Sequence, residues 1–187
     1  MSAENLVEQY EKYCDVLSKV SDSGSVARLS EAIGDRLVLA PRGLTAEDGG
    51  VPGGLVEFSL RAASAAKSMS RHFGDPKTLV RVSLLHELGK LGDLCEGGDL
   101  FLPQESDWHR EKLGQMYKYN DVCSRMNVGH RTLWILSHLN FDLTREEWMA
   151  INVSQGLHLQ ENQFYASSID GIAAGLLAAR LAVLHGE

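Results

Sequence analysis

Residues 84–90 read Leu-Leu-His-Glu-Leu-Gly-Lys, and this run is the feature that most constrains the fold of the 187-residue chain. It sets His86 and Glu87 side by side in an apolar segment, and Lys90 follows one helical turn later. An apolar helix is buried, so it would carry both side chains into the middle of a helical core. Because histidine and carboxylate are common metal ligands, the run predicts an all-α fold with a polar, ligand-like pair at its centre.

The spacing of apolar residues elsewhere also predicts helices. Apolar side chains recur every three or four positions near the N-terminus and again in later segments. Asp75 and Pro76 have the residue types of an N-cap and a first helical position, and Thr144 with Glu147 matches a capping box. The predicted helices span residues 3–19, 26–33, 55–73, 76 to beyond 86, 128–139, 145–157 and 168–185.

Two segments are predicted to be irregular. Residues 34–54 are rich in Gly, Pro and Asp and are expected to form an ordered surface loop. Residues 92–120 are mixed, with a short β-hairpin expected between 100–102 and 116–119 and a helical turn near 108–113. We expect a single domain, in which residues 1–48 form N-terminal helices and a loop and residues 49–185 form the core.

Composition excludes several functional classes. The content of 44% hydrophobic and 23% charged residues is typical of a soluble domain, and the net charge of -7 disfavours a nucleic-acid surface, although a local basic pocket could hold one nucleotide. The polar N-terminus and the lack of any apolar run near ~18 residues predict neither a signal peptide nor a membrane span. Cys14, Cys95 and Cys123 form no CxxC pair, which favours a reducing cytoplasm over a disulfide framework or a cysteine zinc site.

Several short motifs follow one another in an order known from one family. They are Gly-Gly-Leu-Val-Glu-Phe-Ser-Leu at 53–60, the run at 84–90, Ser-Asp-Trp-His-Arg-Glu-Lys-Leu-Gly-Gln-Met-Tyr-Lys-Tyr-Asn at 106–120, His-Arg-Thr-Leu at 130–133, Leu-Thr-Arg-Glu-Glu-Trp at 143–148 and Ala-Ala-Arg at 178–180. In these motifs the chain resembles the HD-domain metal-dependent phosphohydrolases, and in particular a group commonly encoded by tailed bacteriophages. The resemblance implies an HD-type helical bundle with a small irregular or β-hairpin insertion, and a viral source.

The same resemblance implies that the metal site is degenerate. In the family an early His, a His-Asp pair and a late Asp bind one or two divalent metals that activate water. Here Phe58 matches the early His, the pair reads His86-Glu87, and Gly175 matches the late Asp. Neither a phenyl ring nor a glycine offers a ligand atom, and a metal that activates water needs several fixed ligands. We therefore expect no catalytic residue, metal or cofactor at this site.

Three alternatives remain for the polar residues around this site. Relocated ligands could bind Mn, Zn or Fe through His86, Glu87 and His130. Without a metal, Lys90, His130, Arg131 and Arg180 are candidates to hold phosphates in the old pocket. Lys90 or Arg180 could instead neutralise Glu87, because an unpaired buried carboxylate is costly.

Other polar and aromatic residues have simpler interpretations. Asp170 lies three residues after Ser167 and fits the third helical position of a capping box, and His158 follows a helix end. Trp108, Tyr117 and Tyr119 flank the predicted hairpin and are interpreted as core residues rather than as a base-stacking surface.

The leading hypothesis is a catalytically inactive HD-domain protein of a bacteriophage that acts as a structural or interaction protein. Its partner would be a phage structural protein, another protein or a second copy, in the host cytoplasm or, as a capsid-associated component, in the virion. The first alternative is a divergent metal-dependent phosphohydrolase acting on nucleotides or phosphomonoesters. The second is a metal-free nucleotide-binding module.

Overall fold

The computed structural model describes residues 3–94 and 98–186, so Cys95 lies outside the described residues. The chain is mostly helical and has a small two-stranded antiparallel sheet, which confirms the predicted all-α class. The elements are α1 (Ala3–Ser18), α2 (Ser23–Leu39), α3 (Gly54–Phe73), α4 (Pro76–Leu85), the 3-10 helix η1 (Leu88–Leu91), β1 (Phe101–Pro103), α5 (Asp107–Leu113), β2 (Tyr117–Tyr119), α6 (Val128–His138), α7 (Arg145–Val153), the 3-10 helix η2 (Gln160–Tyr165) and α8 (Gly171–His185).

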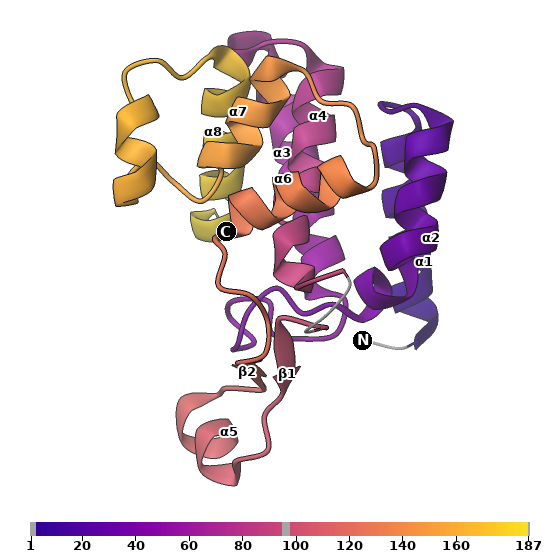
Figure 1. The fold of residues 1–187 in the computed structure, drawn as a ribbon, viewed down its shortest axis with the longest axis vertical. Coiled ribbons are helices and arrows are strands. Elements are labelled where there is room, and N and C mark those ends of the chain that lie inside the picture. The colour runs from indigo at the N-terminus through magenta and orange to yellow at the C-terminus, as the bar shows by residue number, and fades with distance from the viewer. Residues whose placement is uncertain (1–2, 95–97, 187) are drawn as a thin grey trace.

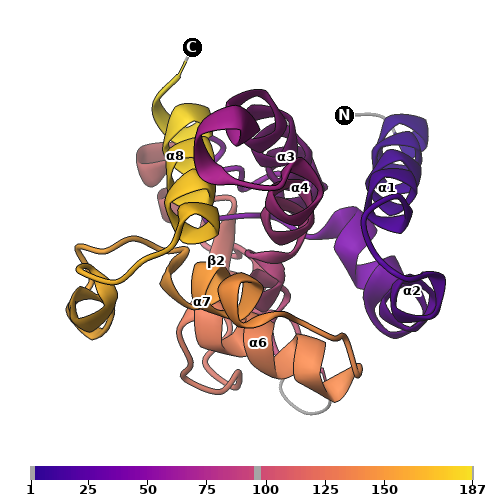
Figure 2. The ribbon, with the colours of Figure 1, turned by 90° about the horizontal axis from the view of Figure 1, so that it is seen from above.

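Helices α3 and α4 form the centre of the molecule. Helix α8 packs along α3 on one side, and the α1–α2 pair packs on the other (Figures 1 and 2). Helix α7 packs against α8, and α6 packs against α7 and η1. Leu79, Leu84 and Leu85 of α4 are fully buried, and the Tyr13 hydroxyl donates to the Leu84 carbonyl oxygen at 2.9 Å. The core therefore lies around α4, the helix that leads into His86.

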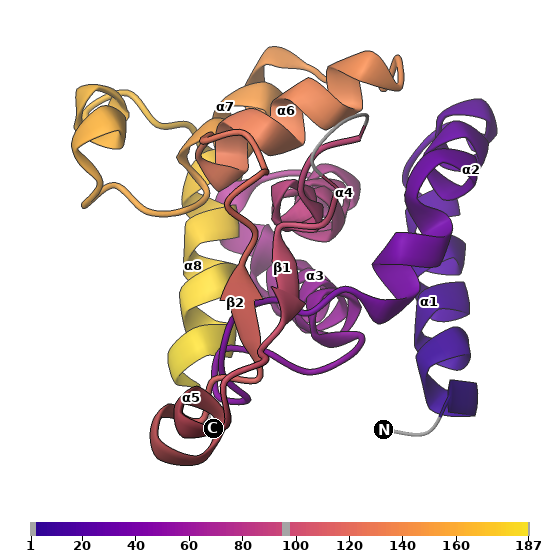
Figure 3. The ribbon, with the colours of Figure 1, turned by 60° about the horizontal axis from the view of Figure 1, so that its bottom comes forward.

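Strands β1 and β2 and helix α5 form an arm, residues 101–119, that extends away from the helices (Figures 1 and 3). The strands pair antiparallel with Phe101 opposite Tyr119, so the predicted hairpin is confirmed. The core interpretation of the arm aromatics is wrong for Trp108 and Tyr119, whose exposed fractions are 58% and 59%. Both side chains lie on the projecting arm and are mostly exposed to solvent.

Helix α2 is longer than predicted, and the predicted loop is correspondingly shorter. The helix continues from Ser23 to Leu39, so the loop prediction for residues 34–54 is wrong for its first six residues. Gly34, the first residue of the predicted loop, lies inside α2, where a Cβ atom would come 2.5 Å from the hydroxyl of Tyr10. This glycine allows α1 and α2 to approach closely rather than ending the helix.

Several helix boundaries follow the predicted caps and others do not. Asp75 accepts a hydrogen bond from the Thr78 backbone N–H at 2.8 Å, and the capping box of Thr144 and Glu147 is present. Helix α7 ends at Val153 rather than 157, and η2 was not predicted. The capping-box interpretation of Asp170 is wrong: this residue is itself the N-cap of α8. Its carboxylate accepts from the Ala173 N–H at 2.9 Å.

None of the helices described in 3–94 and 98–186 combines the length and apolar character needed to cross a lipid bilayer.

Candidate functional site

His86 and Glu87 lie on the turn between α4 and η1, and both are fully buried. Thr132 of α6 contacts this turn: its hydroxyl oxygen accepts from the Gly89 N–H at 2.8 Å and lies 2.8 Å from the Val128 and 3.1 Å from the His86 carbonyl oxygen. A Cβ atom at Gly89 would lie 2.2 Å from the Val128 carbonyl oxygen. Helix α6 therefore rests directly on the turn and determines where the two side chains point.

Both carboxylate oxygens of Glu87 are occupied by cationic side chains. Arg42 donates through Nε to Oε2 at 2.8 Å and through Nη2 to Oε1 at 3.2 Å. The Lys90 ammonium is 3.3 Å from Oε2, and Arg180 Nε is 3.3 Å from Oε1. Lys90 and Arg180 thus take the neutralising position that the sequence left open for them, and Arg42 is a third cation that the sequence reasoning missed.

The three cations keep Glu87 ionised in a buried setting. Burial alone would raise the pKa of this carboxyl group, but the charges of Lys90 and Arg42 and the hydrogen bond from Arg42 hold it well below its ordinary value. Burial also lowers the pKa of Lys90, to about 8, although the charge of Glu87 partly opposes this shift. At neutral pH the cluster therefore contains one negative and three positive groups.

Phe58 supports the cluster from the apolar side. The Arg42 guanidinium carbon lies 3.7 Å from the centre of the Phe58 ring, which is cation–π geometry. The ring of Phe58 is 6.1 Å from the imidazole of His86. The phenyl ring thus fills volume next to His86 and carries Arg42 on its face.

A tight loop, residues 40–53, brings Arg42 to Glu87. The Arg42 N–H donates to the Gly49 carbonyl oxygen at 2.8 Å, and Leu55 N–H donates to the Ala40 carbonyl oxygen at 3.1 Å. A Cβ atom at Gly54 would lie 2.1 Å from the Gly49 oxygen, so only glycine fits where the loop closes on α3. The glycine-rich sequence indicated a loop, but no local pattern indicated its contact with a residue 45 positions away.

His86 is neutral and has one unused nitrogen. Nδ1 lies 2.9 Å from the Ser83 carbonyl oxygen, so Nδ1 carries the proton and Nε2 has a lone pair. Nε2 is buried and has no hydrogen-bond partner in the described part of the chain. Burial lowers the pKa of this imidazole to about 4.

Gly175 does not share the site with the other three positions of the resembling motif. A Cβ atom there would lie 2.7 Å from side-chain atoms of both Leu79 and Phe73. This part of α8 is therefore filled by apolar packing against α3 and α4, and an aspartate would not fit without displacing it. On α8 it is Arg180 that reaches Glu87.

The donor set does not fit a divalent metal. Within residues 3–94 and 98–186, no three His, Cys, Asp or Glu side chains are grouped closely enough to hold an ion. The proposed set of His86, Glu87 and His130 is therefore not assembled, and His130 is exposed. His158 is exposed too, past the end of α7. His86 Nε2 alone retains ligand character, because both Glu87 oxygens already bind cations.

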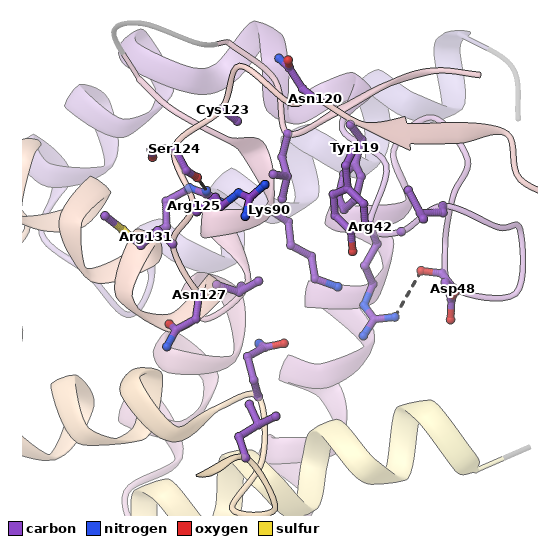
Figure 4. A pocket seen from close by; sticks show the side chains of 18 of the residues that line it. Arg42, Asp48, Lys90, Tyr119, Asn120, Cys123, Ser124, Arg125, Asn127 and Arg131 are labelled. Atoms are coloured by element: carbon purple, nitrogen blue, oxygen red, sulfur yellow. Dashed lines mark hydrogen bonds between the residues drawn. The ribbon is translucent and has the colours of Figure 1, made fainter. Parts of the chain in front are cut away.

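A pocket of about 830 Å³ borders the cluster. Arg42, Lys90 and Arg180 line it, so the cations around Glu87 form part of its wall. Figure 4 shows the ends of Lys90 and Arg42 extending into the same region, near Tyr119 of the arm. The volume lies within the range of small-molecule sites.

Of the four sequence candidates for phosphate binding, Lys90, Arg131 and Arg180 line this pocket and His130 does not. Arg131 is buried and committed elsewhere: it donates to the Gly89 carbonyl oxygen at 3.1 Å and lies 3.4 Å from Asp93. Arg131 therefore joins α6 to η1 and to the segment that follows η1. Lys90 and Arg180 remain available to the pocket.

Comparisons with known proteins do not add to this picture: no family model matches the chain, and no match is found among curated proteins or solved structures. The functional argument therefore rests on the geometry of the site.

Proposed function

We propose that this protein is a catalytically inactive HD-type protein that acts by binding rather than by hydrolysis. One observation carries the proposal: both oxygens of the Glu87 carboxylate, the central acid of the resembling motif, contact Arg42, Lys90 and Arg180. Cations at these oxygens repel a divalent metal, and a carboxylate already saturated with donors is a poor ligand for one.

The two other substituted positions support the same proposal. Phe58 has no ligand atom and holds Arg42 on its ring, and Gly175 lies in apolar packing where an acid would be buried. Phe58 and Glu87 thus belong to an internal ion cluster that stands in the place of a metal centre, and Gly175 lies outside this cluster in apolar packing.

The interaction part of the proposal is supported by the projecting arm. Apolar side chains on the arm and the segment that follows it are exposed, with exposed fractions of 58% for Trp108, 47% for Leu113 and 46% for Met116. Large exposed apolar residues grouped on one projection favour a protein partner. We propose that this partner is another phage protein or a second copy of the chain, in the infected cell or the virion; the viral assignment rests on the sequence motifs alone.

No observation in the described residues favours the divergent phosphohydrolase, since His86, Glu87 and His130 are not assembled into a ligand set.

Hydrolysis of phosphate esters tests the proposal. Purified protein with added Mn²⁺ and a panel of nucleotides and p-nitrophenyl phosphate should release no more phosphate than the His86→Asn variant, whose amide can replace the Nδ1 hydrogen bond to Ser83. Turnover at an ordinary enzymatic rate, on the order of 1 s⁻¹ or faster, that His86→Asn abolishes would overturn it.

A further inference from the structure

The outward face of α1 is acidic. The helix turns Leu6, Tyr13 and Leu17 toward the core. Its opposite face carries four exposed acids, Glu4, Glu8, Glu11 and Asp15. They follow one another at intervals of three or four residues, so they form one stripe along the helix. Asp15 pairs with Lys19 at 2.6 Å, whereas the other three have no ion-pair partner among residues 3–94 and 98–186.

The outward face of α3 is basic. Arg61, Lys67 and Arg71 are exposed along it, and the one acid of this helix, Glu57, is half-buried in the first turn. Arg61 Nη2 donates to the Val183 carbonyl oxygen at 3.5 Å, and Arg71 Nε donates to the imidazole of the next residue at 2.8 Å. None of the three cations pairs with a carboxylate in the part of the chain that the structure describes.

The two faces do not meet within one chain. Helices α1 and α3 pack against each other, and Figure 2 shows α1 at the edge of the molecule. No ion pair joins their outward residues within the described ranges, because each face lies opposite the buried residues of its own helix. Like charges one turn apart on a helix repel each other, and an oppositely charged surface relieves that repulsion. Each face therefore lacks the opposite charge that the other one carries.

We propose that a second copy of this chain docks here, with the acidic face of α1 in one copy on the basic face of α3 in the other. The stripes match in length: at 1.5 Å per residue, Glu4 to Asp15 spans about 16 Å and Arg61 to Arg71 about 15 Å. The inference goes beyond the proposed function, because it identifies a surface other than the arm and does not depend on the loss of hydrolysis.

The side chains between the charges suit a contact between two helices. Ser64 and Ser68 are exposed on the same stripe of α3 as Arg61 and Arg71. Because these serines are small, a helix can approach α3 closely while the longer cations reach around it. Val7 is 49% exposed beside the acids of α1 and supplies an apolar contact at the centre of the pairing.

The chemistry of the contact predicts how the association behaves. Each copy carries both faces, so two copies can form the contact twice about a two-fold axis, or copies can join head to tail. Exposed ion pairs are individually weak and are screened by salt. The association should therefore be reversible, and it should weaken steeply as the ionic strength rises.

Sedimentation velocity of the full chain at several protein concentrations tests the inference. At about 0.02 M NaCl, where charges interact over roughly 20 Å, we expect an average mass above one chain that rises with concentration, and at about 0.5 M NaCl a monomer. A monomer at both salt concentrations would overturn the inference. An association that persists at high salt would overturn it too, and its loss in Trp108→Ala would place the contact on the arm.

Charge reversal tests the location on α1. The double change Glu8→Lys and Glu11→Lys should weaken the association at low salt at least about tenfold, because attraction to the cations of α3 becomes repulsion. Glu146→Lys with Glu161→Lys is the matched control, since it makes the same change of charge at exposed acids of α7 and η2. Equal association of wild type and the α1 double variant would refute the site.

A second reversal tests the partner face. A chain that carries Lys67→Glu and Arg71→Glu in addition to the two α1 changes has both faces with their signs exchanged, so association at low salt should return. All four side chains are exposed, and circular dichroism checks that the variants fold. A folded four-fold variant that stays monomeric would contradict the pairing of α1 with α3. This result would not bear on hydrolysis, because no substrate or metal is present.

Discussion

Glu87 is a buried acid that is neutralised by Lys90, three residues away, and by Arg42 and Arg180, which are far from it in the sequence. Removing a carboxylate from water costs several kcal/mol, and an ion pair offsets that cost only with well-placed hydrogen bonds. Arg42 supplies the shortest of these, at 2.8 Å. The sequence indicated the substituted ligand position at Phe58 and the neutralising candidates Lys90 and Arg180, but it did not indicate Arg42, because proximity across a glycine-rich loop leaves no periodic signal.

His86 makes the stability of the fold depend on pH. Its pKa falls from 6.5 to about 4 on folding, because burial disfavours the imidazolium. Between these values the unfolded chain binds a proton that the folded chain does not, so stability falls as the pH falls. From pH 7 to 5 we expect a loss of about 2 kcal/mol in the free energy of unfolding from this residue, measured by urea denaturation at each pH.

His86→Asn is the control for this effect. The variant keeps a donor for the Ser83 carbonyl oxygen and cannot titrate, so its stability should vary less over the same pH range. Glu87 does not interfere with this comparison above pH 4.5, the pKa of its carboxyl group in the unfolded chain. Because folding lowers this pKa, Glu87 affects stability only below that pH. Parallel pH profiles for the two proteins would contradict the buried, neutral histidine.

Among the helices and strands, residues that cap their own helix were predicted well from the sequence, and residues that contact another element were not. Asp75, Thr144 and Glu147 act within one helical turn, and their caps are present. Gly34 was assigned to the glycine-rich loop, but it lies inside α2 and accommodates Tyr10 from another helix. The same spacing rules cannot distinguish a glycine that ends a helix from one that allows close packing.

Replacement of Gly89 gives the clearest test of a contact between two elements, η1 and α6. A Cβ atom would lie 2.2 Å from the Val128 backbone oxygen, so Gly89→Ala must push α6 away from η1. We expect a loss of about 3 kcal/mol, at the upper end of overpacking effects, measured as the free energy of unfolding in urea.

Gly24→Ala is the matched control, since Gly24 is exposed in the first turn of α2 and a Cβ atom there would meet only side-chain atoms, of Arg28 at 3.3 Å and of Asp22 at 3.4 Å. Its effect should stay within about 0.5 kcal/mol. A Gly89→Ala variant as stable as Gly24→Ala would mean that α6 does not rest on the turn.

For the molecule as a whole, the sequence predicted the helical class and the hairpin but not the pocket. The pocket wall combines the loop at 40–53, η1, the arm, the start of α6 and the end of α8, which are widely separated in the chain. The net charge of -7 also does not indicate that five Lys and Arg side chains but only two Asp side chains line the pocket. Global composition disfavours a nucleic-acid surface, and it leaves open a local basic pocket without indicating where that pocket lies.

The central claim, that an ion cluster replaces a metal centre, is tested most directly by metal content. Protein loaded with Mn²⁺, Zn²⁺ or Fe²⁺ and then desalted should contain far less than one metal per chain by elemental mass spectrometry, because Arg42, Lys90 and Arg180 occupy the Glu87 oxygens. One or more tightly held metal ions per chain, lost in His86→Asn, would contradict the account.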